Sequence, residues 1–188
     1  CGGTENGSAK PKVSPKKLEF MSFEDFSFKL NNKKYVLGEV TITQLLDDGW
    51  ELAYIVDREL VNDPAEFDWA SPPFFLKTKY QSIGVRVQNK TGDETILMKD
   101  VPITQLFWGV YLDDPHDFIE VPFDITLSIE GLFEKAGKPT RYEASNEDNF
   151  QEGRFTAWYE DPASNYFKHY AIEYHNGTLV AIEMVESE

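Results

Sequence analysis

The sequence predicts an α+β fold in which short helices pack on antiparallel β-sheet. Several short runs of residues alternate apolar and polar side chains, with the period of a half-buried strand. Two links between such runs are short and contain Asn-Asn or Asn-Gly, which is typical of β-hairpins. Two other segments carry the capping and stop residues of short helices.

The first predicted element is a strand hairpin. Ordered structure is expected to begin near Leu18, and apolar residues then alternate over residues 26–30. Asn31 and Asn32 follow, and Asn tolerates the positive φ angles that tight turns require. We therefore expect a turn here and a return strand that starts at Tyr35.

A short helix is expected next, over residues 41–49. Thr41 and Gln44 have the spacing of a capping box, and Gly49 provides a C-terminal stop. A strand is expected over residues 50–56. Residues 57–73 contain three prolines, which indicates a long loop.

The middle of the chain is expected to be rich in strands. Runs at residues 74–80, 82–89 and 95–101 are alternating or apolar, and Asn-Lys-Thr-Gly-Asp-Glu between the last two predicts a hairpin turn. A further strand is expected over residues 103–112. It is apolar at nearly every position, so we expect protein to cover both of its faces.

The second predicted helix begins after Ser128, a good N-cap, and has Glu130 in its first turn. Gly137 ends it and Pro139 prevents continuation, while an apolar stripe faces inward at Leu132, Phe133 and Ala136.

Three strands should follow this helix, over residues 154–160, 166–175 and 178–185. The last two are joined by Asn176-Gly177, a strong hairpin signal.

The two predicted helices look alike. Each has a capped start and a terminal glycine, Gly49 or Gly137, and strands follow both. This pattern indicates two related α+β units, residues 18–112 and 113–188, after an unfolded tether over residues 1–17. The alternative is that the ordinary capping and stop residues of helices occur at both places independently.

Composition narrows the functional classes. The chain is 41% apolar and 14% aromatic, which is enough to build a core. Its net charge of −15 would repel nucleic acid, whose binding depends on neutralised phosphates. No apolar run reaches the roughly 18–20 residues that cross a bilayer.

The N-terminus predicts an anchor. Cys1 is the only cysteine and is followed by two glycines and a Lys-, Pro- and Ser-rich stretch. This start resembles mature bacterial lipoproteins, in which the first cysteine carries a diacylglycerol. The resemblance implies a protein held at the extracytoplasmic face of the cell membrane through lipidated Cys1. The alternative is an ordinary exposed cysteine.

A second resemblance covers Asp124 to Val185. The capped helix, the sequence Ala-Gly-Lys-Pro-Thr at residues 136–140 and the following strands resemble domains of the β-lactamase-inhibitor-protein-like and outer-membrane-assembly-lipoprotein families. The whole chain also resembles surface lipoproteins of Gram-positive bacteria, through the element from Leu45 to Trp50. These resemblances imply binding or assembly modules, and no catalytic residues come with them.

Two clusters are candidate metal sites, because carboxylates and imidazoles bind divalent cations. The first lies in a Pro-containing segment that is otherwise a natural surface turn: Asp113, Asp114, His116 and Asp117. The second lies on one face of a predicted strand that is otherwise an ordinary polar outer face: His169, Glu173 and His175.

Most aromatic residues are expected in the core. Trp69, Phe74 and Phe75 occur in or beside a Pro-rich loop, which makes them a candidate interaction surface. The sequence contains no nucleophile elbow, P-loop or dinucleotide fingerprint.

The sequence therefore favours a non-enzymatic, lipid-anchored cell-envelope module that binds another protein or an envelope component, without a cofactor. The alternative from another class is a metal-dependent envelope hydrolase that uses Asp113–Asp117 or the His169–His175 row. A small-ligand carrier is a third possibility and requires a deep apolar pocket.

Overall fold

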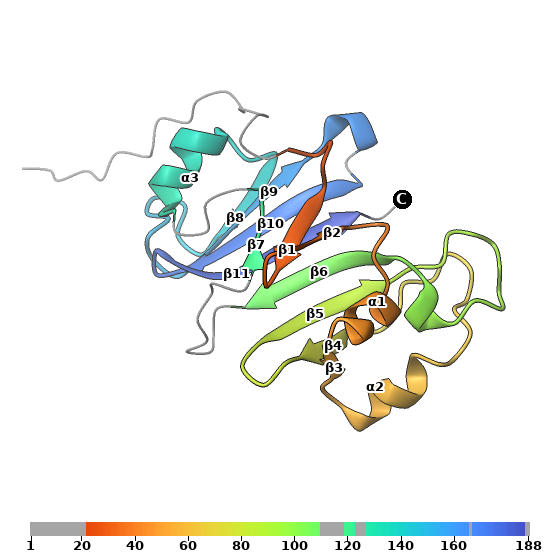
Figure 1. Ribbon diagram of the computed structural model, residues 1–188. Coiled ribbons are helices and arrows are strands. Elements are labelled where there is room, and N and C mark those ends of the chain that lie inside the picture. Colours follow the sequence, from red (N-terminus) through yellow and green to blue (C-terminus); the bar gives the residue numbers. More distant parts are fainter. Residues whose placement is uncertain (1–21, 110–118, 123–126, 166, 187–188) are drawn as a thin grey trace, which may run out of the picture.

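The computed structural model describes residues 22–109, 119–122, 127–165 and 167–186. Across these ranges the chain forms short helices on antiparallel β-sheets, which confirms the predicted α+β class (Figure 1). Cys1, the predicted tether over residues 1–17 and the Asp113–Asp117 cluster lie outside the described residues. In the part of the chain that is described, no helix has the length and apolar character needed to cross a bilayer.

A large antiparallel sheet organises the molecule. Counted over the described residues, it has eight strands in the order β3-β4-β5-β6-β11-β10-β9-β8. The strands are β3 (Glu51–Leu52), β4 (Phe74–Lys77), β5 (Ser82–Val87), β6 (Ile103–Gly109), β8 (Arg141–Ala144), β9 (Arg154–Glu160), β10 (Lys168–His175) and β11 (Thr178–Glu186). Because β6 pairs with β11, strands from both predicted units belong to one continuous sheet.

A smaller sheet lies against one face of the large one. Its described strands have the order β2-β1-β7, with β1 (Ser27–Leu30), β2 (Lys33–Val36) and β7 (Ile119–Glu120). Asn31 and Asn32 form the β1–β2 turn with φ angles of 50° and 67°, as the sequence predicts. Helices α1 (Ile42–Asp47) and α3 (Ile129–Ala136) pack on the same side of the large sheet (Figure 1).

Three buried tyrosines tie the covering layer to the sheet. Tyr159, Tyr170 and Tyr174 point inward from β9 and β10, and each hydroxyl donates a hydrogen bond to a backbone carbonyl of a covering segment. The acceptors are Gly137 at 3.0 Å, Ser22 at 2.8 Å and Leu127 at 2.9 Å. Buried phenols need such partners, so these bonds fix where the layer lies. Burial also raises the pKa of Tyr159 and Tyr170.

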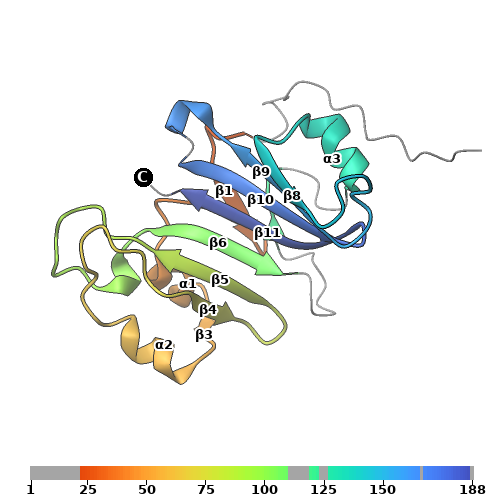
Figure 2. The same cartoon turned by 180° about the vertical axis from the view of Figure 1, so that it is seen from behind.

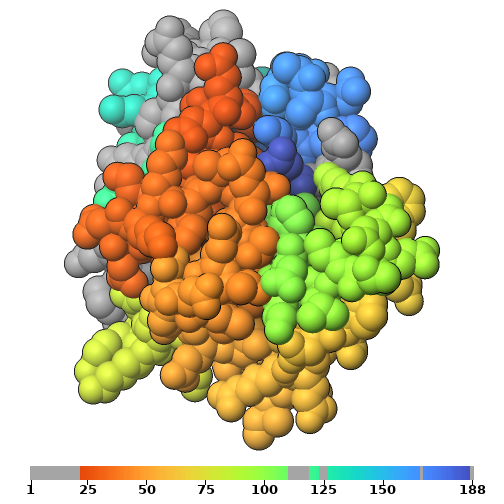
Figure 3. Space-filling model, turned by 45° about the vertical axis from the view of Figure 1, so that its right-hand side comes forward, coloured from red at the N-terminus to blue at the C-terminus, as the bar shows by residue number. Residues whose placement is uncertain are grey.

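Both predicted helix caps are present. The Thr41 hydroxyl accepts from the Gln44 backbone N–H, and the Gln44 side chain accepts from the Thr41 N–H, which completes the capping box. At α3 the Ser128 hydroxyl accepts from the Gly131 backbone N–H, which is a simple N-cap without the reciprocal bond. In the space-filling view, the orange segment that contains α1 packs against the green residues before and within β6 (Figure 3).

The structure corrects the prediction for residues 50–73. The strand expected over residues 50–56 ends at Leu52. Helix α2 (Ile55–Leu60) replaces the end of that strand and the start of the expected loop. The buried Asp57 carboxylate of α2 accepts a hydrogen bond from the Phe75 backbone N–H at 3.4 Å. The helix is thus held to β4 by a contact between residues 18 positions apart.

The strand expected over residues 95–101 is also wrong, because this segment contains the 3₁₀ helix η1 (Met98–Asp100). The cause is Asn89, which is fully buried and donates to the carbonyls of Ala65 and Asp93 at 2.8 Å each. Its side chain satisfies the loop backbone where a hairpin ladder would otherwise do so. Strand β8 was not expected from the sequence at all.

Candidate functional site

Strand β6 has one open face, although the sequence predicts that both are covered. Leu106 and Trp108 are buried on the side of the helices, whereas Gln105, Phe107 and Gly109 lie on the other side and are partly or fully exposed. None of the described helices or strands lies over this second side of the large sheet (Figure 2). We call it the open face.

One row of residues runs across the open face from β4 to β8. The strand register aligns seven positions in this row: Phe75, Gly84, Phe107, Glu183, Ala171, Trp158 and Arg141. Three of the seven are large aromatics, and two have little or no side chain. An antiparallel sheet usually presents polar residues to solvent, so this composition is unusual for an uncovered face.

Aromatic rings form a continuous strip at one end of this row. Tyr54 meets Phe75 edge-on with ring centres 5.6 Å apart, and Phe75 meets Phe107 edge-on at 5.7 Å. We call Tyr54, Phe75 and Phe107 the aromatic strip. Ile55 and Val56, at the start of α2, extend it with side chains that are 77% and 67% exposed. The result is a contiguous apolar surface at the edge of the open face.

A central hollow of about 450 Å³ lies beside the strip. The small residues Ala171 and Ala181 lie between the larger side chains of Phe107 and Trp158, and all four line the hollow. Its lining comes from β5, β6, β9, β10 and β11, so strands of both predicted units contribute to it.

Most charges on the open face are paired. Arg154 forms an ion pair with Glu173 at 3.0 Å, and Arg141 forms one with Glu160 at 3.2 Å. The Arg141 guanidinium also stacks on Trp158, 3.9 Å from the ring centre. Exposed pairs of this kind stabilise a fold only slightly, by about 0–1 kcal/mol each. Their main effect is to hold long side chains in place at the border of the hollow.

Among the described residues, two polar groups in the lining of the hollow have no hydrogen-bond partner. Thr156 is only 4% exposed, and its hydroxyl makes no hydrogen bond. The Nε atom of Arg86 is also enclosed without an acceptor. Unsatisfied buried polar groups are rare in native proteins and call for an explanation.

Two of the three residues of the sequence-predicted aromatic surface are accessible to solvent. Trp69 is 43% exposed in its loop, and Phe75 lies on the open face. Phe74 is fully buried in the core, so its prediction as a surface residue is wrong. The reason is strand geometry, because consecutive side chains of a strand point to opposite faces. Phe107 and Trp158 were missed, because an apolar run does not reveal which side of a sheet is uncovered.

The His169–His175 row lies on the open face as predicted, with Tyr170, Ile172 and Tyr174 buried behind it. It does not form a metal site. Strand residues rise about 3.3 Å each, which separates positions 169 and 173 by roughly 13 Å and positions 169 and 175 by roughly 20 Å. Glu173 pairs with Arg154 instead. In the described part of the chain, no three His, Cys, Asp or Glu residues are placed to hold a metal.

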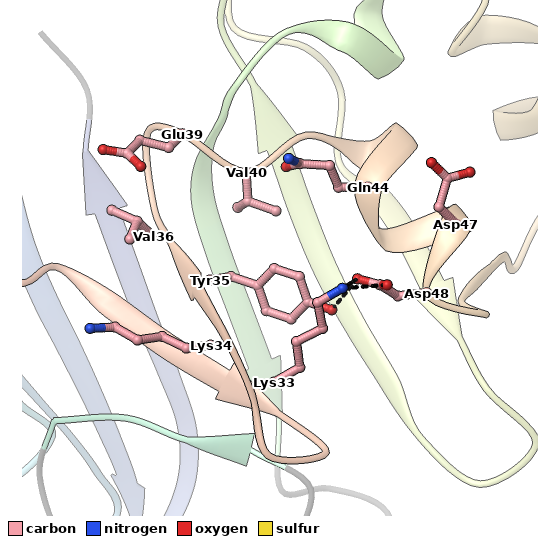
Figure 4. Close-up of a pocket in the computed structure, with 9 residues that line it drawn as sticks. All are labelled: Lys33, Lys34, Tyr35, Val36, Glu39, Val40, Gln44, Asp47 and Asp48. Atoms are coloured by element: carbon pink, nitrogen blue, oxygen red, sulfur yellow. Dashed lines mark hydrogen bonds and ion pairs between the residues drawn. The ribbon is translucent and has the colours of Figure 1, made fainter.

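A second hollow, of about 400 Å³, lies between β2 and α1 on the opposite side (Figure 4). Here the Asp48 carboxylate accepts hydrogen bonds from the Tyr35 hydroxyl and the Lys33 ammonium, both at 2.6 Å to Oδ2. These donors, Lys33 above all, lower the pKa of Asp48, while burial and Asp48 raise the pKa of Tyr35. The three groups satisfy one another, so this cluster fastens β2 to α1.

Comparisons with known proteins gave no match to a family model, to a curated protein or to a solved structure.

Proposed function

We propose that this chain is a non-catalytic binding module whose open face docks another protein. The observation that carries the proposal is the row of aromatic and small residues on the uncovered side of the large sheet. Protein interfaces are enriched in aromatic residues and Arg at their centres, with polar residues around them. The aromatic strip, Trp158 and the surrounding Arg–Glu pairs match that composition.

The proposal includes two related helix-plus-strands units. In chain order, α1 precedes β3, β4, β5 and β6, and α3 precedes β8, β9, β10 and β11. The last strand of each set pairs with the other, β6 with β11. This parallel order of elements supports a duplicated unit. Joining the units at their last strands doubles the width of the face that either would present alone.

Photo-crosslinking in the native cells tests the docking face. A benzophenone amino acid at Phe107 should yield one discrete crosslinked product, and its yield should fall when Trp158→Ala is added. The same probe at Lys34, an exposed residue of β2 on the opposite side, serves as the control and should give no such product. Equal products from both positions, or none from Phe107, would contradict the proposal.

Membrane attachment through lipidated Cys1 is a separate part of the proposal. The intact mass of protein purified from its native membrane should exceed the chain mass by a diacylglyceryl group. The Cys1→Ala variant should lack the increment and appear in the medium. An unmodified Cys1 would remove the anchor and leave the docking face untouched.

A further inference from the structure

Arg86 is the exception among the arginines of the open face. Arg141 and Arg154 each have a carboxylate partner. Arg86 reaches only the Ser71 carbonyl, which its Nη1 meets at 3.4 Å, and its enclosed Nε has no acceptor. Within the described residues, it is a half-buried cation without a counter-charge, in a protein whose net charge is −15.

Among the described residues, the two acidic side chains that line the hollow form no ion pair with Arg86. Glu183 accepts a hydrogen bond from Gln105, the cross-strand neighbour of Arg86, and Glu173 is taken by Arg154. A partly desolvated guanidinium whose Nε has no acceptor is unfavourable. The group that fits the planar donors of a guanidinium best is a carboxylate, which can bind with two parallel hydrogen bonds. Because Arg86 lines the hollow, its guanidinium can meet one carboxylate there.

The surroundings of Arg86 favour a carboxylate on a polypeptide. Phe107 lies diagonally across from Arg86 and lines the same hollow, so the ligand should carry an apolar group beside its charge. Glu173 and Glu183 also line the hollow and would repel a phosphate dianion more strongly than a single carboxylate. The overall charge of −15 further disfavours a strongly acidic partner.

We propose that the central hollow binds a protein segment that presents one Asp or Glu carboxylate to Arg86 and an adjacent bulky apolar side chain to Phe107. The partner is neutral or basic overall. From β5 to β9 the hollow spans four strand spacings of about 4.8 Å, the length of roughly six extended residues. At its far end lies Thr156, whose buried hydroxyl is the second unsatisfied group. This proposal rests on the proposed function.

Selection from a randomised twelve-residue peptide library against the immobilised full-length chain tests it. Enriched peptides should carry Asp or Glu next to a bulky apolar residue. Changing that acid to its amide should raise Kd about tenfold, the loss expected for one charge-assisted pair. Arg86→Gln should raise Kd by a similar factor and make the acid and amide peptides equivalent. Arg86→Lys should give an intermediate Kd, because it keeps the charge and loses the planar donors.

Arg58→Gln is the matched control, because Arg58 is an exposed arginine of α2 outside the lining of the hollow. This control variant should leave the Kd of the enriched peptides nearly unchanged. Circular dichroism verifies that each variant is folded. If Arg86→Gln does not fold, Arg86→Lys still tests the site.

Each remaining outcome contradicts the proposal. Peptides that lose binding on Phe107→Ser but not on Arg86→Gln or Arg86→Lys would overturn the carboxylate site and leave the docking face standing. Peptides whose Kd changes neither with Phe107→Ser nor with the Arg86 variants would overturn both the carboxylate site and the docking face. A selection that enriches no peptide would overturn both as well. Displacement of the peptide by inorganic phosphate more strongly than by acetate would identify a phosphate site instead.

Discussion

Gly84 shapes the open face at the scale of a single residue. The Phe107 ring lies directly over it, so that a Cβ atom at position 84 would overlap ring atoms of Phe107. The ring therefore lies close over β5 at Gly84, and it also meets Phe75. A side chain of any size at position 84 would lift the ring and break the aromatic strip.

Gly84→Ala should therefore move the Phe107 ring and destabilise the fold by about 1–3 kcal/mol, as over-packing does. Urea unfolding measures the loss, and the aromatic NMR signals of Phe107 should shift. Unchanged stability together with unchanged Phe107 signals would show that the ring does not rest on Gly84.

His169 gives the open face a pH-dependent group. Its partial burial, and to a lesser extent Arg141, lower its pKa below 6.5, against the opposing influence of Glu183 and Glu160. The unfolded chain then binds a proton that the folded chain does not. Stability should therefore decrease as the pH falls from 6.5 toward the folded pKa.

NMR titration of the imidazole should place the midpoint below 6.5, and His169→Gln should remove part of the stability loss between neutral and mildly acidic pH. A midpoint at or above 6.5 would mean that the two glutamates outweigh burial.

At the scale of elements, the helices depend on their caps. Helix α1 has only six residues, too few to be stable alone. Its capping box satisfies backbone donors at the first turn, and Leu45 is buried in the core. Local sequence and tertiary packing therefore act together on the same short segment.

Thr41→Ala should lower the free energy of unfolding by about 1 kcal/mol, the usual value of a lost N-cap. Thr178→Ala, at an exposed position that begins β11, is the control and should change it much less. Equal losses in the two variants would argue that the cap does not stabilise α1.

Elements specified by neighbouring residues were predicted well. The two capped helices and the turns at Asn31-Asn32 and Asn176-Gly177 depend on short-range chemistry, and the structure has them. Elements that depend on contacts between residues far apart in the sequence were not predicted. Helix α2 depends on a bond from Asp57 to β4, and the loop before β6 depends on buried Asn89. Tertiary packing likewise decides which side of β6 is uncovered, so most of the candidate site could not be predicted from the sequence.

At the scale of the whole molecule, the β6–β11 pairing joins the two halves. One buried cluster contains residues of both, among them Leu45, Val85, Leu132 and Tyr170. A shared sheet and a shared core leave neither half with a complete interior of its own.

Unfolding should accordingly be a single cooperative transition. Amide hydrogen exchange of β5 and β10, followed over a series of urea concentrations, should converge on one opening free energy. Separate values for the two strands would show that the halves unfold independently.

The central claim is that the open face, rather than the loop around Trp69, contacts a partner. Hydroxyl-radical footprinting compares the two surfaces directly, in the purified protein and in the native cell envelope. Trp158 and Phe107 should be oxidised about threefold more slowly in the envelope, since a bound partner excludes solvent from the centre of an interface. Trp69 should react equally in both states. Protection of Trp69 with unchanged Trp158 and Phe107 would contradict the account.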